Sequence, residues 1–274
     1  MLRAIDFFNL NEYRFRDLFI DTEYVWEGLV RIKTYLKDKL EGNTGAIRRG
    51  SSFVDQTCVM YRGEVITGGF EIDATGKKVL VKMDGSVLEG ASVIYAGSHL
   101  LDDYIYIGSN TIIEPCALIK GPTIIGNNSE IRHGAYIRGE VLVGDDCVVG
   151  HTTEIKSSVM LGGSKAGHFA YIGDSILGSV NLGAGTKLAN LKMIDSQVVV
   201  NAEGQVFKTG LRKFGAVLAD GVETGCNSVT TPGTLLGKKV VLYPNCTARG
   251  YYPPETIIKA KRNKDFAKLN RIGQ

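Results

Sequence analysis

The sequence predicts an all-β solenoid, a fold in which short strands wind in successive coils around one core. Three observations predict it: an aliphatic residue recurs at every sixth position, a small or β-branched residue stands two places before it, and glycine is abundant. Glycine makes up 34 of the 274 residues, more than its usual share of about 7%. The chain therefore turns often and at regular intervals.

The repeat runs through ten consecutive hexapeptides. Its aliphatic positions are Ile107, Ile113, Ile119, Ile125, Ile131, Ile137, Val143, Val149, Ile155 and Leu161. The positions two residues earlier are Ile105, Thr111, Ala117, Thr123, Ser129, Ala135, Val141, Cys147, Thr153 and Val159. Because residues two apart on a strand point to the same side, each hexapeptide predicts a short strand with two inward side chains and a turn. Stacked coils then supply each strand with its neighbours.

The flanking regions predict three parts of the chain. Residues 1–83 form an N-terminal cap over the open end of the solenoid. It is helical up to residue 42, where Trp26 and Leu36 belong to a helix-like spacing, and has short strands between glycines over residues 43–83,. Residues 84–250 form the β-helix. The repeat lapses near residues 163–168, and residues 190–209 are expected to be an excursion. Residues 251–274 form a basic tail with a short helix.

Composition restricts the partners and the compartment. The net charge of +3 is small for this length, so no nucleic-acid-binding surface is expected. No stretch approaches the roughly 18 apolar residues of a membrane span, so we expect no membrane association. The five cysteines contain no C-x-x-C pair, which favours reduced thiols in the cytoplasm.

His168 is the strongest candidate catalytic residue, because it lies where the repeat lapses. Histidine titrates near neutral pH and is the side chain most often used as a general base. It lies in the string Lys165-Ala166-Gly167-His168, followed by Tyr171-Ile172-Gly173-Asp174 and then by Val180-Asn181-Leu182-Gly183-Ala184-Gly185-Thr186.

These strings resemble the acetyltransferase half of the bacterial bifunctional N-acetylglucosamine-1-phosphate uridylyltransferase/glucosamine-1-phosphate acetyltransferases, within the hexapeptide-repeat acyltransferase superfamily. The resemblance covers roughly residues 85–250 and is strongest over residues 138–190. It implies a left-handed β-helix whose triangular coils hold three hexapeptides, or eighteen residues. It also implies a cytoplasmic homotrimer that uses acetyl-CoA as co-substrate.

The implied activity is N-acetyl transfer from acetyl-CoA to an amino-sugar phosphate such as glucosamine-1-phosphate. This reaction feeds UDP-N-acetylglucosamine biosynthesis and the cell envelope. The resemblance assigns His168 as general base. It assigns substrate binding to Arg138, Lys156, Tyr171, Asn181 and Asn190, and coenzyme contacts to Ala184 and Cys226.

Coils of eighteen residues would place Lys120, Arg138 and Lys156 in one vertical line. Like charges on adjacent strands repel, so this ladder predicts either a bound anion, an acidic neighbour or a solvated edge. The roles implied for Arg138 and Lys156 favour a phosphate.

His133 and His151 are also eighteen residues apart, which would suit a zinc enzyme of the γ-carbonic-anhydrase kind. Such a site needs a third ligand, which the sequence does not provide, so we expect no metal.

Two departures limit what the resemblance implies. Leu191 follows Asn190 where the family has a tyrosine, which puts the choice of sugar in question. Residues 1–83 are too short for the uridylyltransferase domain and lack its glycine-rich signature, so pyrophosphorylase activity is not expected. A non-catalytic trimeric subunit that binds sugar phosphate for regulation or assembly remains the alternative.

Overall fold

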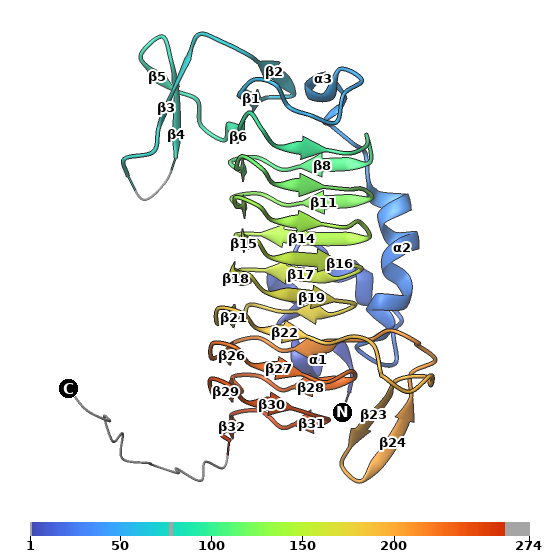
Figure 1. Ribbon diagram of the computed structural model, residues 1–274. Helices are drawn as coiled ribbons and strands as arrows, with labels where there is room; N and C mark the ends of the chain where they lie inside the picture. Colours follow the sequence, from blue (N-terminus) through green and yellow to red (C-terminus); the bar gives the residue numbers. More distant parts are fainter. Residues whose placement is uncertain (1, 77–78, 261–274) are drawn as a thin grey trace, which may run out of the picture.

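The computed structural model describes residues 2–76 and 79–260, and it is dominated by a left-handed parallel β-helix of about nine turns (Figure 1). Three sheets of parallel coil strands form the sides of the prism, and the consecutive strands of each coil belong to different sheets. The predicted fold class is confirmed. None of the described helices combines the length and the apolar character needed to cross a membrane.

Sheet 1 has eleven strands, the first two of which are antiparallel additions at its end. In spatial order they are β2 (Glu64–Ile66), β1 (Cys58–Tyr61), β6 (Ser92–Ile94), β9 (Ile112–Ile113), β12 (Glu130–Ile131), β15 (Val148–His151), β18 (Lys165–His168), β21 (Asn181–Leu182), β26 (Glu223–Thr224), β29 (Val241–Leu242) and β32 (Ile257–Ile258).

Sheets 2 and 3 have eight strands each. Sheet 2 contains β7 (His99–Leu100), β10 (Leu118–Ile119), β13 (Tyr136–Ile137), β16 (Glu154–Lys156), β19 (Tyr171–Gly173), β22 (Lys187–Leu188), β27 (Val229–Thr230) and β30 (Thr247–Ala248). Sheet 3 contains β8 (Ile105–Ile107), β11 (Thr123–Ile125), β14 (Val141–Asp145), β17 (Val159–Gly162), β20 (Ile176–Leu177), β25 (Ala216–Leu218), β28 (Thr234–Leu236) and β31 (Tyr251–Tyr252).

The register confirms the eighteen-residue coil over the first part of the prism. Leu118 pairs with Tyr136 and Tyr136 with Glu154. Further along, Val148 pairs with Lys165, seventeen residues away, and Lys165 pairs with Asn181, sixteen residues away. The lapse in the sixfold pattern is therefore a shortening of the coil.

This shortening corrects the tenth predicted repeat. Val143, an inward residue, pairs with Met160 and not with Leu161. The inward residues of that strand are consequently Ser158 and Met160, both fully buried, and Val159 turns outward. The prediction of Val159 and Leu161 as inward residues was wrong, because losing one residue from a strand reverses the face of every following side chain.

The outer face of sheet 3 is apolar along its whole length. Its outward residues are Tyr106, Ile124, Leu142, Val159, Ile176, Val217, Leu235 and Tyr251. Most of them are buried, so this face needs a cover. The N-terminal segment provides it, through α1 (Ala4–Phe7), two short 3-10 turns (Leu10–Glu12 and Arg16–Phe19) and α2 (Glu27–Lys39). Figure 1 shows α2 running along the side of the prism.

The N-terminal region therefore differs from the expected end cap. Residues 4–39 lie along the side of the solenoid, while α3 (Gly45–Arg48), β1 and β2 lie at its end (Figure 1). An arm of β3 (Phe70–Asp73), β4 (Leu80–Met83) and β5 (Ser86–Val87) projects sideways from the same end, on the side opposite α2 (Figure 1). The helix expected within residues 1–42 is present as α2, whose Ile32 and Leu36 are buried.

The excursion expected at residues 190–209 is present. It carries the antiparallel hairpin of β23 (Val199–Ala202) and β24 (Gln205–Lys208). The ring of Phe207 in this hairpin lies 6.3 Å from that of Trp26, so the hairpin packs on the N-terminal segment.

At the other end, β31 and β32 continue the coil past residue 250 to Ile258. Residues 261–274, which include most of the basic run and the helix expected there, lie outside the described residues.

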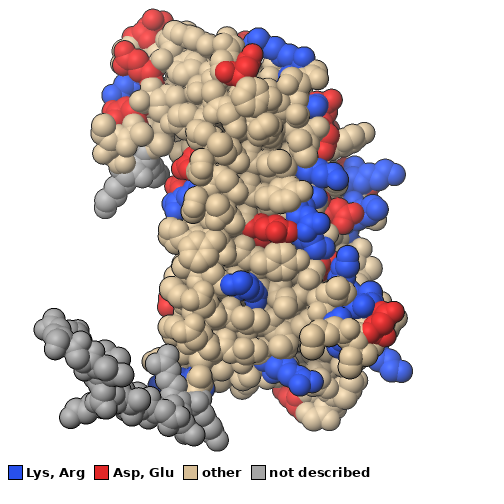
Figure 2. Space-filling model, in the orientation of Figure 1, with Lys and Arg blue, Asp and Glu red and all other residues tan. Residues whose placement is uncertain are grey.

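Figure 2 shows a largely uncharged face of the prism, with most lysine and arginine side chains along the edge on the α2 side.

Candidate functional site

The edge between sheets 1 and 2 brings together the residues assigned to catalysis and to the coenzyme. His151 pairs with His168. The pairing of Lys165 with Asn181 and of Asn181 with Glu223 extends this alignment from His168 to Ala184 and Cys226. We call the five aligned residues His133, His151, His168, Ala184 and Cys226 the histidine column. Parallel strands are about 4.8 Å apart, so each member is next to the one in the following coil.

The upper two histidines of the column stack on each other. Their ring centroids are 5.8 Å apart with an interplanar angle of 15°, and Nδ1 of His151 lies 3.1 Å from the carbonyl oxygen of His133. The described residues contain no group of three or more His, Cys, Asp or Glu side chains placed to hold a metal ion.

His168 is exposed to solvent, and its imidazole makes no hydrogen bond within the described part of the chain. The following residue, Phe169, has a backbone φ of +36°, which is rare for a bulky side chain. This turn leaves the Phe169 ring half exposed, 6.4 Å from the His168 ring. The His168 edge is therefore open to a substrate and carries one aromatic neighbour.

Gly185 makes the turn below His168 possible. Its φ of +73° suits glycine, and an added Cβ would lie 3.1 Å from the Phe169 ring. The Gly185 amide donates to the His168 carbonyl oxygen at 3.0 Å. The glycines around Ala184 thus keep the backbone below His168 compact.

The residues assigned to the acceptor lie on sheet 2 and at its far edge. Arg138 follows β13, and its guanidinium donates to Glu154 Oε1 at 2.7 Å. Lys156 ends β16, and its Nζ lies 2.9 Å from Asp174 Oδ2. Each of these cations in the ladder therefore has an acidic partner, which relieves the repulsion between them.

The two ion pairs differ in exposure. The side chains of Lys156 and Asp174 are each 15% exposed, whereas those of Arg138 and Glu154 are 43% and 36% exposed. The hydrogen bond from Arg138 to Glu154 raises the pKa of Arg138. Lys120, at the top of the ladder, is exposed and has no ion pair among the described residues.

Asn190 and Tyr171 complete a polar cluster around Lys156. The Asn190 amide donates to the Asp174 carboxylate, and the Tyr171 hydroxyl donates to Asn190 Oδ1 at 3.3 Å. Burial raises the pKa of Tyr171, so its hydroxyl stays protonated near neutral pH. We call Arg138, Lys156, Tyr171, Asp174 and Asn190 the acceptor cluster.

Gly173 keeps space open in the acceptor cluster. A Cβ at this position would lie 2.7 Å from both the Tyr171 hydroxyl and the Asn190 amide nitrogen. Its φ is not in the positive region, so the constraint here is space and not backbone conformation.

The turn between β18 and β19 connects the histidine column to the acceptor cluster. Tyr171 follows His168 by three residues, and because the chain turns at Phe169 their backbones are less than about 10 Å apart, the length of three extended residues,. Asn181 is placed apart from the cluster, on the outer face of sheet 1, where it pairs with Lys165 and Glu223. The structure therefore brings four of the five predicted substrate residues to one sheet and leaves Asn181 on the next.

Three residues in or beside the acceptor cluster had no predicted role: Asp174, which belongs to it, and Glu154 and Gly173, which contact its members. A signal was present for two of them. Asp174 and Gly173 belong to the same Y-x-G-D string as Tyr171, but the string alone does not show which cation the carboxylate contacts. Glu154 stands two residues before Lys156 and reaches Arg138 only because the coils stack.

Comparison with known proteins agrees with the motifs. Residues 119–211 match the family model described as the GMPPB C-terminal domain. The chain is 42% identical over 83 residues to the bifunctional sugar-1-phosphate nucleotidylyltransferase/acetyltransferase of Sulfurisphaera tokodaii, over 30% of this chain and 21% of that protein. It is 36% identical over 108 residues to the bifunctional protein GlmU of Methanococcus vannielii, over 39% of this chain and 26% of that protein.

The matched region thus spans about a quarter or less of the length of these relatives, and over that region the predicted resemblance is confirmed. Among solved structures, the UDP-N-acetylglucosamine acyltransferase from Campylobacter jejuni is similar with a TM-score of 0.26 and 17% identity, over 60% of this chain and 68% of that chain.

Proposed function

We propose that this protein is a CoA-dependent N-acetyltransferase. It transfers the acetyl group of acetyl-CoA to the amino group of an amino-sugar phosphate such as glucosamine-1-phosphate. One observation carries the proposal: His168 lies in one column with Ala184 and Cys226 and only three residues before Tyr171 of the acceptor cluster. A base at this edge can reach a thioester on one side and an amine on the other.

In the proposed reaction, the neutral amine attacks the thioester carbonyl carbon and a C–N bond forms. A ring nitrogen of His168 takes the proton that the amine loses. The tetrahedral intermediate then collapses, the C–S bond breaks, and the CoA thiolate leaves and is protonated. General-base catalysis of this kind contributes about 10² to 10⁴ in rate.

The acceptor cluster would hold the sugar phosphate. Arg138 and Lys156 offer the cationic N–H donors that phosphate oxygens accept best, and Tyr171 and Asn190 offer hydrogen bonds to sugar hydroxyls. Binding a phosphate here requires Arg138 and Lys156 to share their donors with Glu154 and Asp174. Asn181 would position the reacting groups from the sheet 1 side.

The assembly and the setting belong to the same proposal. The outward residues of sheets 1 and 2 are mixed and partly polar, and no segment of the described chain covers most of these faces. A homotrimer with sites between neighbouring prisms would use them. The five free cysteines favour the reducing cytoplasm,, where the product would feed sugar-nucleotide synthesis for the cell envelope.

A thiol-release assay with acetyl-CoA and a panel of hexosamine phosphates tests the proposal. We expect turnover with at least one acceptor and a loss of about 10²-fold or more in kcat for His168→Asn. His133→Asn is the matched control, because His133 occupies the same column two coils away, and it should leave kcat unchanged.

Two results would count against the enzyme. Absence of acetyl-CoA consumption with every acceptor, together with phosphate-sugar binding that Arg138→Gln abolishes, would support the non-catalytic binding subunit instead. If His168→Asn and His133→Asn lowered kcat equally, His168 would not be the general base.

A further inference from the structure

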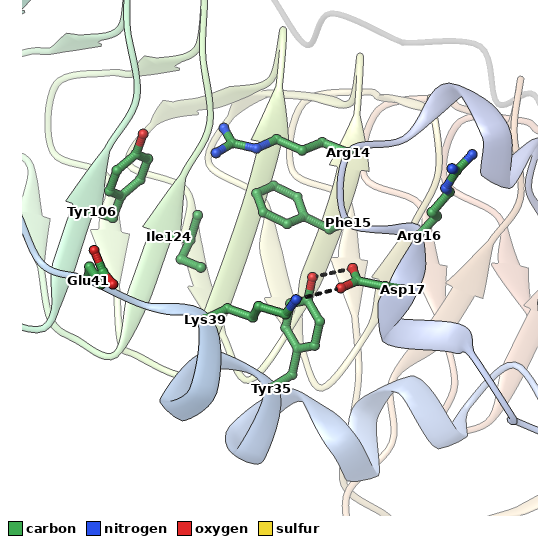
Figure 3. Close-up of a pocket in the computed structure, with 9 residues that line it drawn as sticks. All are labelled: Arg14, Phe15, Arg16, Asp17, Tyr35, Lys39, Glu41, Tyr106 and Ile124. Atoms are coloured by element: carbon green, nitrogen blue, oxygen red, sulfur yellow. Dashed lines mark hydrogen bonds and ion pairs between the residues drawn. The ribbon is translucent and has the colours of Figure 1, made fainter.

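The N-terminal segment leaves a pocket where it crosses the outer face of sheet 3 (Figure 3). Its volume is about 430 Å³, within the range of about 300 to 1,000 Å³ that is usual for small-molecule sites. Its floor is the side chain of Ile124 on β11, and Tyr106 on β8 stands beside it. The pocket lies on a different sheet from the histidine column and the acceptor cluster, so a ligand bound there would be independent of the proposed function.

Arg14 supplies an oriented cation at the mouth of this pocket. Its guanidinium carbon lies 5.1 Å from the ring centroid of Phe15 and 5.9 Å from that of Tyr106. It forms one long ion pair, with Asp145 Oδ1 at 4.0 Å, which is too long for a hydrogen bond. Two rings thus hold the guanidinium in place, while its N–H donors remain available to a ligand.

The other charges of the pocket are largely committed elsewhere. Asp17 accepts a hydrogen bond from the Tyr35 hydroxyl at 2.5 Å and pairs with Lys39 Nζ at 3.0 Å. Burial raises the pKa of Asp17, but the bonds from Tyr35 and Lys39 outweigh it, and the net shift is downward. Asp17 and Lys39 therefore form an ion pair with no net charge. Arg16 donates to Asn11 at 3.1 Å and points away from Arg14 in Figure 3.

The remaining polar groups are the Tyr106 hydroxyl and the Glu41 carboxylate, which lies at the edge of the pocket beside Tyr106 (Figure 3). The pocket thus presents one available guanidinium, a flat wall of aromatic and aliphatic side chains, and one carboxylate on the side away from Asp17. A small anion such as inorganic phosphate would use only the first of these. A ligand that uses all three needs an anionic group, a planar apolar body and hydroxyl donors.

We propose that this pocket binds a nucleoside 5′-phosphate, with the phosphate on Arg14, the base against Tyr106 and Ile124, and the ribose hydroxyls toward Glu41. Arginine suits the phosphate because its planar fork can donate two parallel hydrogen bonds. Every nucleobase has a flat face that stacks on tyrosine or arginine planes. The apolar wall of Tyr106 and Ile124 and the Arg14 guanidinium therefore indicate the class of ligand. They do not indicate which nucleobase it carries.

Isothermal titration calorimetry of the full chain with AMP, GMP and UMP tests this inference. We expect at least one nucleotide to bind with one site per chain, and the corresponding nucleoside to bind at least tenfold more weakly. Arg14→Gln should weaken nucleotide binding at least tenfold. Arg62→Gln is the matched control, because Arg62 also lies over one ring, 5.0 Å from the centroid of Tyr61, but far from the pocket in the β1–β2 turn.

Three results would overturn the inference. The first is that none of the three nucleotides binds at millimolar concentration. The second is that nucleotide and nucleoside bind with equal affinity. The third is that Arg14→Gln and Arg62→Gln weaken nucleotide binding equally. Tyr106→Ala provides a second variant if Arg14→Gln does not fold, and it should weaken nucleotide binding while leaving the affinity for inorganic phosphate unchanged. Acetyl transfer by Arg14→Gln should equal that of the unmodified protein, which keeps this test distinct from that of the proposed function.

Discussion

Lys156 Nζ lies 2.9 Å from Asp174 Oδ2, and both side chains are largely buried. The Asp174 carboxylate is therefore already paired with Lys156, the cation that would bind a sugar phosphate. The same carboxylate accepts from Asn190, so it positions two residues of the acceptor cluster at once. Any anion that enters the cluster must compete with Asp174.

Asp174→Asn should therefore strengthen phosphate binding. The amide oxygen can still accept hydrogen bonds from Lys156 and Asn190, but the negative charge that repels a phosphate is gone. We expect the KM for a phosphorylated acceptor to fall by up to about fivefold, since a pair of charges near the surface contributes about 0.2 to 1 kcal/mol. A rise in KM would show instead that the charge of Asp174 is needed to position Lys156. Glu130→Gln, on sheet 1, serves as control for removal of a paired carboxylate.

Arg138→Gln should weaken binding of phosphorylated acceptors selectively. A hydrogen bond to a charged group contributes about 1.5 to 3 kcal/mol, so the KM should rise tenfold or more. The KM of the same sugar without phosphate should stay unchanged.

Arg132→Gln is the matched control for Arg138, because Arg132 also pairs with a carboxylate, at 2.6 Å from Glu130, but on sheet 1. If both variants change the KM equally, the effect reflects overall charge and not a phosphate site.

Gly173→Ala should disrupt the acceptor cluster by bulk alone. The new Cβ would lie 2.7 Å from the Tyr171 hydroxyl and from the Asn190 amide nitrogen, closer than real Cβ contacts allow. We expect acceptor KM to rise and the melting temperature to fall, because Gly173 and Asn190 are both buried. Gly68→Ala meets no atom within 4 Å and should alter neither quantity.

Tyr13→Phe should destabilise the attachment of the N-terminal segment to the prism. The Tyr13 hydroxyl donates to Asp220 and accepts from the Ser179 amide at 3.0 Å. Removing the hydroxyl deletes both bonds, while the Ser179 amide still donates to Asp220 at 3.1 Å, so the expected loss is that of ordinary hydrogen bonds, about 0.5 to 1.5 kcal/mol each. Urea unfolding followed by circular dichroism at pH 7 measures this difference, and an unchanged midpoint would contradict it.

The same residue predicts a dependence on alkaline pH. Burial, followed by the hydrogen bond to Asp220, raises the pKa of Tyr13 in the folded state above its ordinary value. The folded state therefore holds this proton more tightly than the unfolded state. The contribution of Tyr13 is complete below pH about 10 and decreases as the pH rises above it. The stability gap between the unmodified protein and Tyr13→Phe should narrow accordingly at alkaline pH.

Much of the solenoid followed from the sixfold repeat, since Ile107, Ile125 and Ile155 are all buried as expected. The prediction failed at Leu161, where one residue is missing from the coil and the face of the strand is reversed. A periodicity fixes which side chains share a face only while the coil length is constant. The handedness came from resemblance, because general sterics favour right-handed crossovers.

The candidate site was predictable in parts. His168, Arg138 and Lys156 stood out by motif and by spacing, and the register places His168 in line with Ala184 and Cys226. The roles assigned to these residues stay predictions. The acidic partner of Lys156 was not predicted, although Asp174 stands eighteen residues after Lys156, in line with the ladder. The register there is seventeen residues, since Lys156 pairs with Gly173, so Asp174 lies one residue past the position opposite Lys156.

The sequence by itself determined the repeat, the inward residues of most strands and the place where the repeat lapses, because these depend on periods of two and six along one chain. Only the tertiary structure decided which face the N-terminal segment covers. That choice depends on the outward residues of eight separate strands forming one apolar face. The pocket at Arg14 and the pairing of Lys156 with Asp174 are likewise products of packing between segments from different coils and elements.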